Sequence, residues 1–282
     1  MTKRVAMLGE QSRFIAEALA ERGYTVTQLG LTDLPAQLIA SRPDIVFNAL
    51  TSTAGRDGRV QGLLELVGVP YTHSGVLASA LAANRHQAKI MLRAAGLPVT
   101  DHILVDRAEA ARGHQMAPPY VVKPIMAGSS EPAILAGRSD ERPKRLLAAD
   151  WRGGEEVMLE RFVPGRTLDV VVMGGIALGV SEVIVKENGP ELATPAAISP
   201  NIYEKLQKMS LKAHETLGCR GVTRTRFRYN DQASGDTGLV CLAVDTQPEL
   251  SPGAVVPVQA GYAGHRLSEL VAWMVEDASC NR

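Results

Sequence analysis

Short apolar strands alternate with helical patterns at the start of the chain, and this alternation constrains the fold more than any other feature. Three apolar runs are predicted as strands: 4–9, 24–29 and 44–48. Helical segments after the first and third runs end at Gly23 and Gly68, since glycine readily takes the left-handed conformation that closes a helix. Alternating strands and helices form a parallel sheet covered on both faces, so we expect an N-terminal α/β domain.

Ligands of such sheets bind beyond the carboxyl ends of the strands. This places residues 9–12 and 49–58 at the ligand-binding rim. The first segment opens with Gly9-Glu10-Gln11 and lacks the spaced glycines of a phosphate-binding loop. The rim is therefore a candidate binding site without a phosphate motif of its own.

Composition argues against several classes of function. The 30 Lys and Arg residues balance 30 Asp and Glu residues without a basic block, so nucleic acid is not an expected partner. The three cysteines are odd in number and widely spaced, which argues against a disulfide framework and a CxxC metal site. No signal peptide opens the chain and no apolar run is long enough to span a bilayer. We expect a cytoplasmic protein without a membrane partner.

A β-hairpin pattern near the C-terminus is expected to form a ligand-facing surface. Residues 224–228 and 239–251 alternate or run apolar, and the turn-rich segment 230–238 joins them. A second hairpin is predicted about Gly174-Gly175, and an amphipathic helix over residues 199–217. Side chains that project from the C-terminal hairpin onto one face can meet a ligand.

Motifs spread over nearly the whole chain share their order and spacing with one known family. They are Phe47-Asn48-Ala49-Leu50, Asp57-Gly58, Gly68-Val69-Pro70-Tyr71-Thr72, Ser74-Gly75-Val76, Val121-Val122-Lys123-Pro124, Gly128-Ser129-Ser130, Phe162-Val163-Pro164-Gly165 and Thr246-Gln247-Pro248. With these motifs the chain resembles the D-alanine–D-alanine ligases, which have an ATP-grasp fold. The resemblance implies an N-terminal parallel-sheet (pre-ATP-grasp) domain over residues 1–84. It also implies two α+β ATP-grasp lobes, over residues 85–165 and 166–282, that face each other across a cleft.

The resemblance assigns nucleotide-binding roles to residues of the central lobe. Lys89 and Lys123 match two lysines that reach the nucleotide phosphates. Ser129 and Ser130 belong to the loop that covers the phosphates, and Glu160 matches an acid of the adenine hinge. A lysine at a strand end, beside a turn of small residues, can neutralise phosphate while backbone N–H groups approach closely.

Further assignments by resemblance fall on the C-terminal lobe. Lys186 keeps a nucleotide-binding place at the start of the segment 187–199, which is shorter than the family's active-site loop and lacks its lysine and tyrosine. Arg224 matches a catalytic arginine that stabilises the transferred phosphate, whereas Arg226 and Ser251 lie on the substrate side. We expect one cleft to be lined by Lys89, Lys123, Glu160, Arg224 and Asp245.

The acids that bind metal in the family are not matched here. Arg226 replaces an aspartate and Ala243 replaces a glutamate, so Asp245, in the place of an asparagine, is the weak remnant of a metal site. Mg²⁺ prefers near-octahedral oxygen ligands that include one or two carboxylates. We therefore expect weak ATP binding and no Mg²⁺ bound in the family manner. Other departures are Thr51, Arg56, Ala127, Pro132, Thr167 and Glu249, the last in place of an oxyanion-site glycine.

Two roles are open for Arg226. It binds phosphate directly and partly replaces the charge of the metal, or it forms an ion pair with Asp245 or Glu249. We expect the ion pair.

These departures predict a D-alanine–D-alanine ligase-like protein that is catalytically impaired or inactive. Its expected role is binding or regulation linked to peptidoglycan precursor synthesis. The alternative is an active ATP-dependent carboxylate–amine ligase with an altered phosphate and metal site, and a nucleotide sensor without turnover lies between the two. The family match over residues 61–80 indicates either a retained homodimer interface or ordinary core. The expected partners are a second copy of the chain and cell-wall synthesis proteins.

Overall fold

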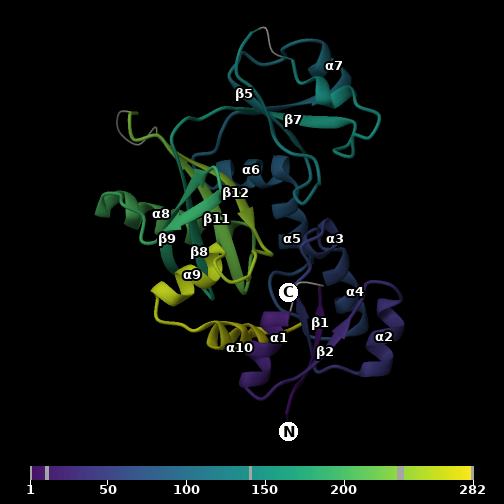
Figure 1. The fold of residues 1–282 in the computed structure, drawn as a ribbon. Coiled ribbons are helices and arrows are strands. Elements are labelled where there is room, and N and C mark those ends of the chain that lie inside the picture. Colours follow the sequence, from purple (N-terminus) through teal and green to yellow (C-terminus); the bar gives the residue numbers. More distant parts are fainter. Residues whose placement is uncertain (1, 10–12, 140–141, 234–237, 281–282) are drawn as a thin grey trace.

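A computed structural model describes residues 2–9, 13–139, 142–233 and 238–280 (Figure 1). The described chain holds three β-sheets with helices packed around them. Two predicted features lie partly outside the described residues: the rim segment 9–12 and the hairpin link 230–238. No described helix has the length and apolar character needed to cross a membrane.

The N-terminal sheet is parallel, as the alternating pattern predicted. Its order is β2 (Thr25–Leu29), β1 (Arg4–Leu8) and β3 (Ile45–Asn48). Its helices are α1 (Arg13–Glu21), α2 (Leu34–Ser41), α3 (Thr53–Arg56), α4 (Arg59–Val67) and α5 (Val76–Ala83). The short helix α2 was not predicted, because Asp33 and Pro35 give its start the composition of a turn. The side chains of Leu34 and Leu38 on this helix are buried.

The central sheet is antiparallel and has the order β4 (His102–Asp106), β7 (Glu156–Arg161), β5 (Tyr120–Pro124) and β6 (Ile134–Ala136). Helix α6 (Arg85–Ala94) precedes it, and Asn84 caps this helix by accepting a hydrogen bond from the Gln87 N–H. Helix α7 (Arg107–Arg112) and the short 3₁₀ helix Lys144–Leu147 pack beside the sheet.

The C-terminal sheet is antiparallel and contains both predicted hairpins. Its strands, in spatial order, are β10 (Gly189–Ala193), β9 (Ile176–Lys186), β8 (Arg166–Met173), β11 (Val222–Tyr229) and β12 (Leu239–Asp245). The predicted amphipathic helix is α8 (Pro200–Thr216), with Ser199 as its N-cap. Two further helices are α9 (Val255–Tyr262) and α10 (Leu267–Asp277). Strand β10 was not predicted, because its Gly189-Pro190 start is typical of a turn.

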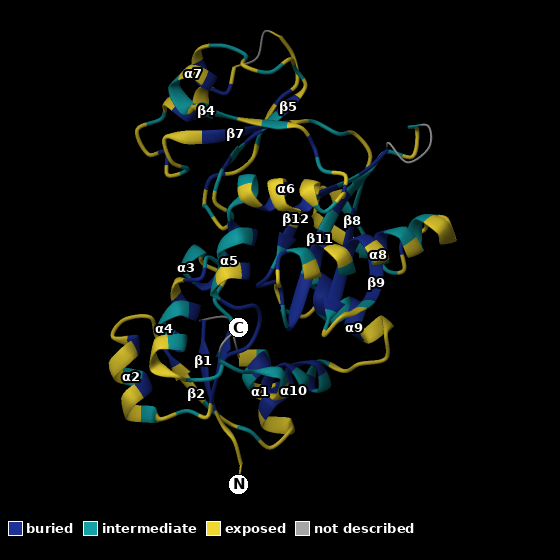
Figure 2. Ribbon diagram, turned by 180° about the vertical axis from the view of Figure 1, so that it is seen from behind, coloured by how far each residue is buried: buried dark blue, intermediate teal, exposed yellow. Residues whose placement is uncertain are grey.

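One hydrophobic cluster joins the two ends of the chain. It combines Val5 and Phe47 of the N-terminal sheet with Leu270 and Met274 of α10. Figure 1 shows α10, in yellow, beside α1, in purple. Figure 2 shows the buried strands of the C-terminal sheet, while α2 and part of α8 are exposed. This cluster brings residues from both ends of the chain into one core. The domain boundaries predicted at residues 84 and 165 therefore stay predictions.

Candidate functional site

A cavity of about 200 Å³, open to solvent, lies where α3, α6 and the β11–β12 hairpin meet. Its basic lining residues are Arg56, Arg85, Lys89, Arg224 and Arg226, and Asp245 is its acidic one. We call this space the arginine cavity. Arg224 and Arg226 reach it together because side chains two positions apart in a strand project from the same face.

Arg226 forms an ion pair with Asp169, which lies directly opposite it on β8. Its Nε and Nη2 atoms donate to the two carboxylate oxygens at 2.8 and 2.7 Å, a bidentate arrangement. These hydrogen bonds raise the pKa of Arg226, and the Asp169 side chain is fully buried. Arg226 thus forms an ion pair, but with Asp169; the predicted partners, Asp245 and Glu249, were wrong. Asp169 had not been recognised, since nothing local in the sequence reveals which residue of β8 faces Arg226.

Asp245 is shared between two arginines. Arg224 donates to its Oδ2 at 3.0 Å, and Arg56 of α3 approaches both carboxylate oxygens at 3.4 Å. The Gln247 N–H donates to Oδ1 at 3.0 Å. The carboxylate thus joins the N-terminal sheet region to the C-terminal hairpin, and its oxygens already have donors.

A second ionic network lies beneath the cavity and is centred on Glu160 of β7. Lys123 donates to Glu160 Oε2 at 2.7 Å, while Lys89 lies 3.4 Å from Oε1 and 2.7 Å from Thr100 Oγ1. Burial alone would raise the pKa of Glu160, but Lys89 and Lys123 together bring it below its usual value. Because Lys89 is buried and shares this one carboxylate with Lys123, its own pKa is lowered.

This network accounts for three of the predicted nucleotide-binding residues. Lys89 lines the cavity, but only 2% of its side chain is exposed. Lys123 and Glu160 connect to the cavity through Lys89. The predicted cleft residues are therefore brought together, with the lysines held by a buried carboxylate.

Arg85 is a cavity residue that sequence reasoning missed. It is the first residue of α6, and its Nη1 donates to the carbonyls of Pro124 and Met126 at 2.7 and 2.8 Å. No ion pair joins Arg85 to any residue in the described ranges, and burial lowers its pKa. Its position at a helix start, four residues before Lys89, was the available signal.

The small-residue loop reaches the cavity through Ala127 and Gly128 rather than through its serines. Thr53 of α3 donates to the Gly128 carbonyl at 2.9 Å. Ser129 accepts a hydrogen bond from the Glu131 N–H at 3.2 Å, and Ser130 is exposed. The buried carboxylate of Glu131 accepts from Arg145 and from the Arg152 N–H, and these contacts anchor the loop.

Lys186 does not meet the arginine cavity. It is the last residue of β9, its side chain is 57% exposed, and it forms an ion pair with Glu191 of β10. The hairpin contact therefore gives Lys186 a structural partner, and its nucleotide-binding role stays a prediction.

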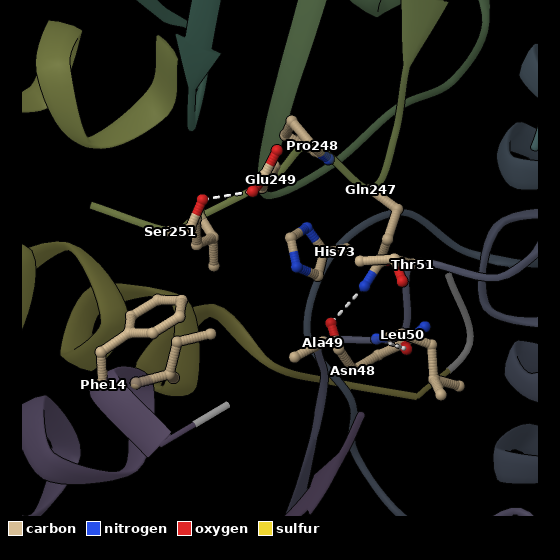
Figure 3. A pocket seen from close by; sticks show the side chains of 12 residues that line it. Phe14, Asn48, Ala49, Leu50, Thr51, His73, Gln247, Pro248, Glu249 and Ser251 are labelled. Carbon is tan, nitrogen blue, oxygen red and sulfur yellow. Dashed lines mark hydrogen bonds between the residues drawn. The ribbon is translucent and has the colours of Figure 1, made fainter. Parts of the chain in front are cut away.

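Ser251 lines a second, small pocket of about 30 Å³ between the end of β3 and the loop after β12 (Figure 3). Ser251 donates to Glu249, and the Gln247 side-chain amide donates to the Asn48 carbonyl. His73 enters this pocket with a φ of 69°, a left-handed conformation uncommon for histidine, and was not predicted from the sequence. The substrate-side assignment of Ser251 thus falls on a pocket wall, separate from the arginines.

The residues at the predicted metal positions do not fit Mg²⁺. Within the described ranges, no group of three potential metal ligands is found. Arg226 and Ala243 supply no oxygen ligand, and both oxygens of Asp245 face arginines. Mg²⁺ would have to displace at least one guanidinium and then bind a single carboxylate between cations.

Comparisons with known proteins all show similarity to D-alanine–D-alanine ligases. The family model described as "D-ala D-ala ligase C-terminus" matches residues 91–276. A D-alanine–D-alanine ligase of Sinorhizobium medicae is 45% identical over 95% of this chain and 91% of the relative. A D-alanine–D-alanine ligase of Parvibaculum lavamentivorans is 47% identical over the same shares.

Solved structures match the fold as a whole. The D-alanine–D-alanine ligase of Bacillus anthracis superposes with a TM-score of 0.82 at 21% identity, covering 98% of this chain and 97% of that one. Its complex with ATP gives a TM-score of 0.80. The predicted ATP-grasp fold is confirmed by this likeness.

Proposed function

We propose a function from the premise that this chain belongs to the D-alanine–D-alanine ligase family. In this proposal, the chain binds a ligand in its ATP-grasp cleft but does not ligate D-alanine. The observation that carries the proposal is the engagement of Asp245 by Arg224 and Arg56. Asp245 is the one carboxylate at the positions predicted to bind metal. Because its oxygens accept hydrogen bonds from arginines, these positions offer Mg²⁺ no free oxygen ligand.

The chemistry of ligation supports the same conclusion. Formation of an acyl phosphate depends on a metal ion that bridges phosphates and neutralises the developing charge. An arginine supplies positive charge but has no open coordination positions for phosphate and water. Glu249 adds a carboxylate in the Ser251 pocket, where oxyanion stabilisation requires hydrogen-bond donors. Each loss of this kind typically costs about 10²–10³ in rate.

We place the proposed role in the cytoplasm, near peptidoglycan precursor synthesis. The similarity to D-alanine–D-alanine ligases supports this proposal. A protein that keeps the fold and loses the reaction can still bind a nucleotide or a partner of that pathway, as a sensor or a regulator. ATP binding is proposed to be weak, because Lys89 and Lys123 are already engaged by Glu160.

The test is a ligation assay with ATP, Mg²⁺ and D-alanine that measures both dipeptide and released phosphate. The Sinorhizobium medicae ligase serves as the positive control. We expect no dipeptide above background from this chain. Dipeptide formation that disappears in Lys123→Ala would overturn the proposal.

An active ligase with an altered phosphate and metal site is the second candidate. The observation in its favour is the high identity to ligases over 95% of the chain, together with an arginine cavity that is open to solvent. Phosphate release with an amine other than D-alanine would identify this alternative.

A homodimer through residues 61–80 stays a prediction. The segment exposes Leu66 by 89% and Leu77 by 69%, whereas Leu64 and Tyr71 are buried. The exposed leucines support an interface and the buried ones a core role. Analytical ultracentrifugation of the native chain and of Leu66→Glu measures the mass of each in solution. A dimer that the substitution dissociates would support the interface, and a monomer in both would support the core role.

A further inference from the structure

We infer that the arginine cavity is a metal-independent site for a phosphate or diphosphate ester, in which arginines supply the positive charge that Mg²⁺ would otherwise provide. This inference rests on the proposed function, since it names the class of ligand that the cleft would bind. It differs from the predicted phosphate role of Arg226, because the structure points to other arginines.

The charges around the cavity are unbalanced. Four arginines, Arg56, Arg85, Arg224 and Arg226, line it, and among the described residues only Asp169 and Asp245 form ion pairs with them. Arginine stays protonated in proteins, so none of the four can lose its charge to relieve the excess. An excess of two positive charges in a partly buried space favours binding of a dianion.

The arginines do not contribute equally to this excess. Arg226 is fully engaged, because both carboxylate oxygens of Asp169 accept from it at 2.7–2.8 Å. Among the residues whose structure is described, Arg85 donates only to carbonyl groups. Arg56 and Arg224 share one carboxylate, and in the described part of the chain the buried Nε atom of each has no hydrogen-bond partner. The free binding capacity therefore lies with Arg56, Arg85 and Arg224.

The remaining walls of the cavity indicate an organic ester rather than a bare anion. Apolar side chains complete the lining: Ala82, Ala83, Ala88, Leu92, Leu242 and Val244. Phosphate groups would contact the guanidinium groups, while the apolar body of the ligand would cover these side chains. A nucleoside diphosphate or triphosphate has this combination of groups, and inorganic pyrophosphate has the charged half alone.

Asp245 acts in this scheme as an internal competitor for the anion. It occupies Arg56 and Arg224 with a single carboxylate, so an incoming phosphate must displace it or share its donors. Removing its charge would free both arginines and strengthen anion binding. In a metal-dependent site the same change would remove the metal ligand and weaken binding.

The experiment is isothermal titration of the native chain with ATP, ADP, pyrophosphate and adenosine, each in EDTA and again with Mg²⁺. We expect ATP, ADP and pyrophosphate to bind in EDTA with affinities that Mg²⁺ changes by less than about threefold, and adenosine not to bind. We expect ADP to bind more strongly than pyrophosphate, because the body of the ester would also cover the apolar wall, and equal binding would overturn the assignment of an ester. Binding of ATP that requires Mg²⁺, or no anion binding in EDTA, would overturn the inference.

Variants assign the effect to individual residues. Arg85→Gln and Arg224→Gln should each weaken pyrophosphate binding about tenfold or more, the loss expected for a hydrogen bond between charged groups. Asp245→Asn should strengthen it on the order of threefold to tenfold. Arg59→Gln is the matched control, because this neighbouring arginine is 68% exposed and pairs with Asp57 outside the cavity.

Each variant is first checked for a native thermal transition, and Arg85→Lys replaces any Arg85→Gln protein that does not fold. Weaker binding by Asp245→Asn, or unchanged binding by both arginine variants, would contradict the inference. The ligation assay is independent of these titrations. A chain that made dipeptide yet bound pyrophosphate in EDTA would therefore disprove the proposed function and leave the anion site standing.

Discussion

The pairing of Arg226 with Asp169 shows how a single substituted position gains a new structural role. A guanidinium at a place expected to carry a metal-binding acid meets a fully buried carboxylate on the next strand. The Asp169 carboxylate is fully buried and depends on this partner for its charge compensation, whereas the Arg226 side chain is 37% exposed and also reaches solvent. Arg226 therefore stabilises the fold through Asp169, whereas Arg224 and Arg56 share Asp245 within the cavity.

Arg226→Ala is expected to destabilise the chain by about 3 kcal/mol, because it leaves the Asp169 carboxylate buried with only Arg224, at 3.7 Å, as a cationic neighbour. Urea unfolding measures this effect. The double variant Arg226→Met with Asp169→Leu should recover most of the stability, and a loss in the double variant as large as in the single one would argue against the pair.

Glu160 is expected to make the free energy of unfolding depend on pH under acidic conditions. The pKa of the Glu160 carboxyl in the folded chain lies below its ordinary value, because Lys89 and Lys123 outweigh the opposing effect of burial. The stabilisation is thus fully present above the unfolded pKa and is lost as the pH falls through the folded pKa. Glu160→Gln should cost most stability at pH 7 and progressively less below about pH 4.5. A free energy difference between native and variant chains that stayed constant from pH 7 to pH 3 would refute this prediction.

At the scale of elements, the loop after β5 is held between two anchors. Thr53 of α3 bonds the Gly128 carbonyl, and the buried carboxylate of Glu131 accepts from Arg145 and from the Arg152 N–H. The side of the cavity formed by Ala127 and Gly128 is therefore fixed by contacts outside the cavity.

Glu131→Gln should loosen this loop and destabilise the chain by about 2 kcal/mol, because hydrogen bonds between charged groups contribute about 1.5–3 kcal/mol. Faster amide exchange over residues 125–132 is the expected signature. Glu155→Gln provides the control, since its side chain is 80% exposed and pairs with Arg107. Equal exchange in both variants would show that Glu131 does not anchor the loop.

For the molecule as a whole, the cluster between the N-terminal sheet and α10 connects the start of the chain to its end. Leu270 and Val275 of α10 are fully buried in this cluster beside Val5 and Phe47. Lys3 and Tyr24 reinforce the contact from outside, through Glu276. The N-terminal sheet cannot unfold alone without exposing this apolar surface.

Leu270→Ala should therefore cost about 2–5 kcal/mol and lower the stability of both regions together. Unfolding followed by tryptophan fluorescence, with Trp273 on α10, and by circular dichroism should give coincident transitions. Leu77→Ala is the control, because its side chain is exposed in this chain. Two separate transitions in native protein would show that the cluster does not couple the ends.

Local sequence patterns determined much of this fold. The parallel N-terminal sheet, the two C-terminal hairpins and helix α8 followed from apolar periodicity, turn residues and caps, which act over a few positions. Segments with weak or contradictory local signals, such as α2 and β10, were missed because tertiary packing outweighs their turn-like residues.

Which charges meet was decided by the tertiary structure alone. Lys89, Lys123 and Arg224 were identified from the sequence, whereas Arg85 was not. The partners of such charges lie far away: Asp169 is 57 positions from Arg226, and Arg56 is 189 positions from Asp245. Such pairs depend on strand order, on register and on how α3 packs against the hairpin, and a shift of one residue would turn the side chains to the other face. The sequence alone predicted that the metal-binding acids are replaced. Which charged side chains meet was determined only in the folded chain, because these pairs depend on tertiary packing.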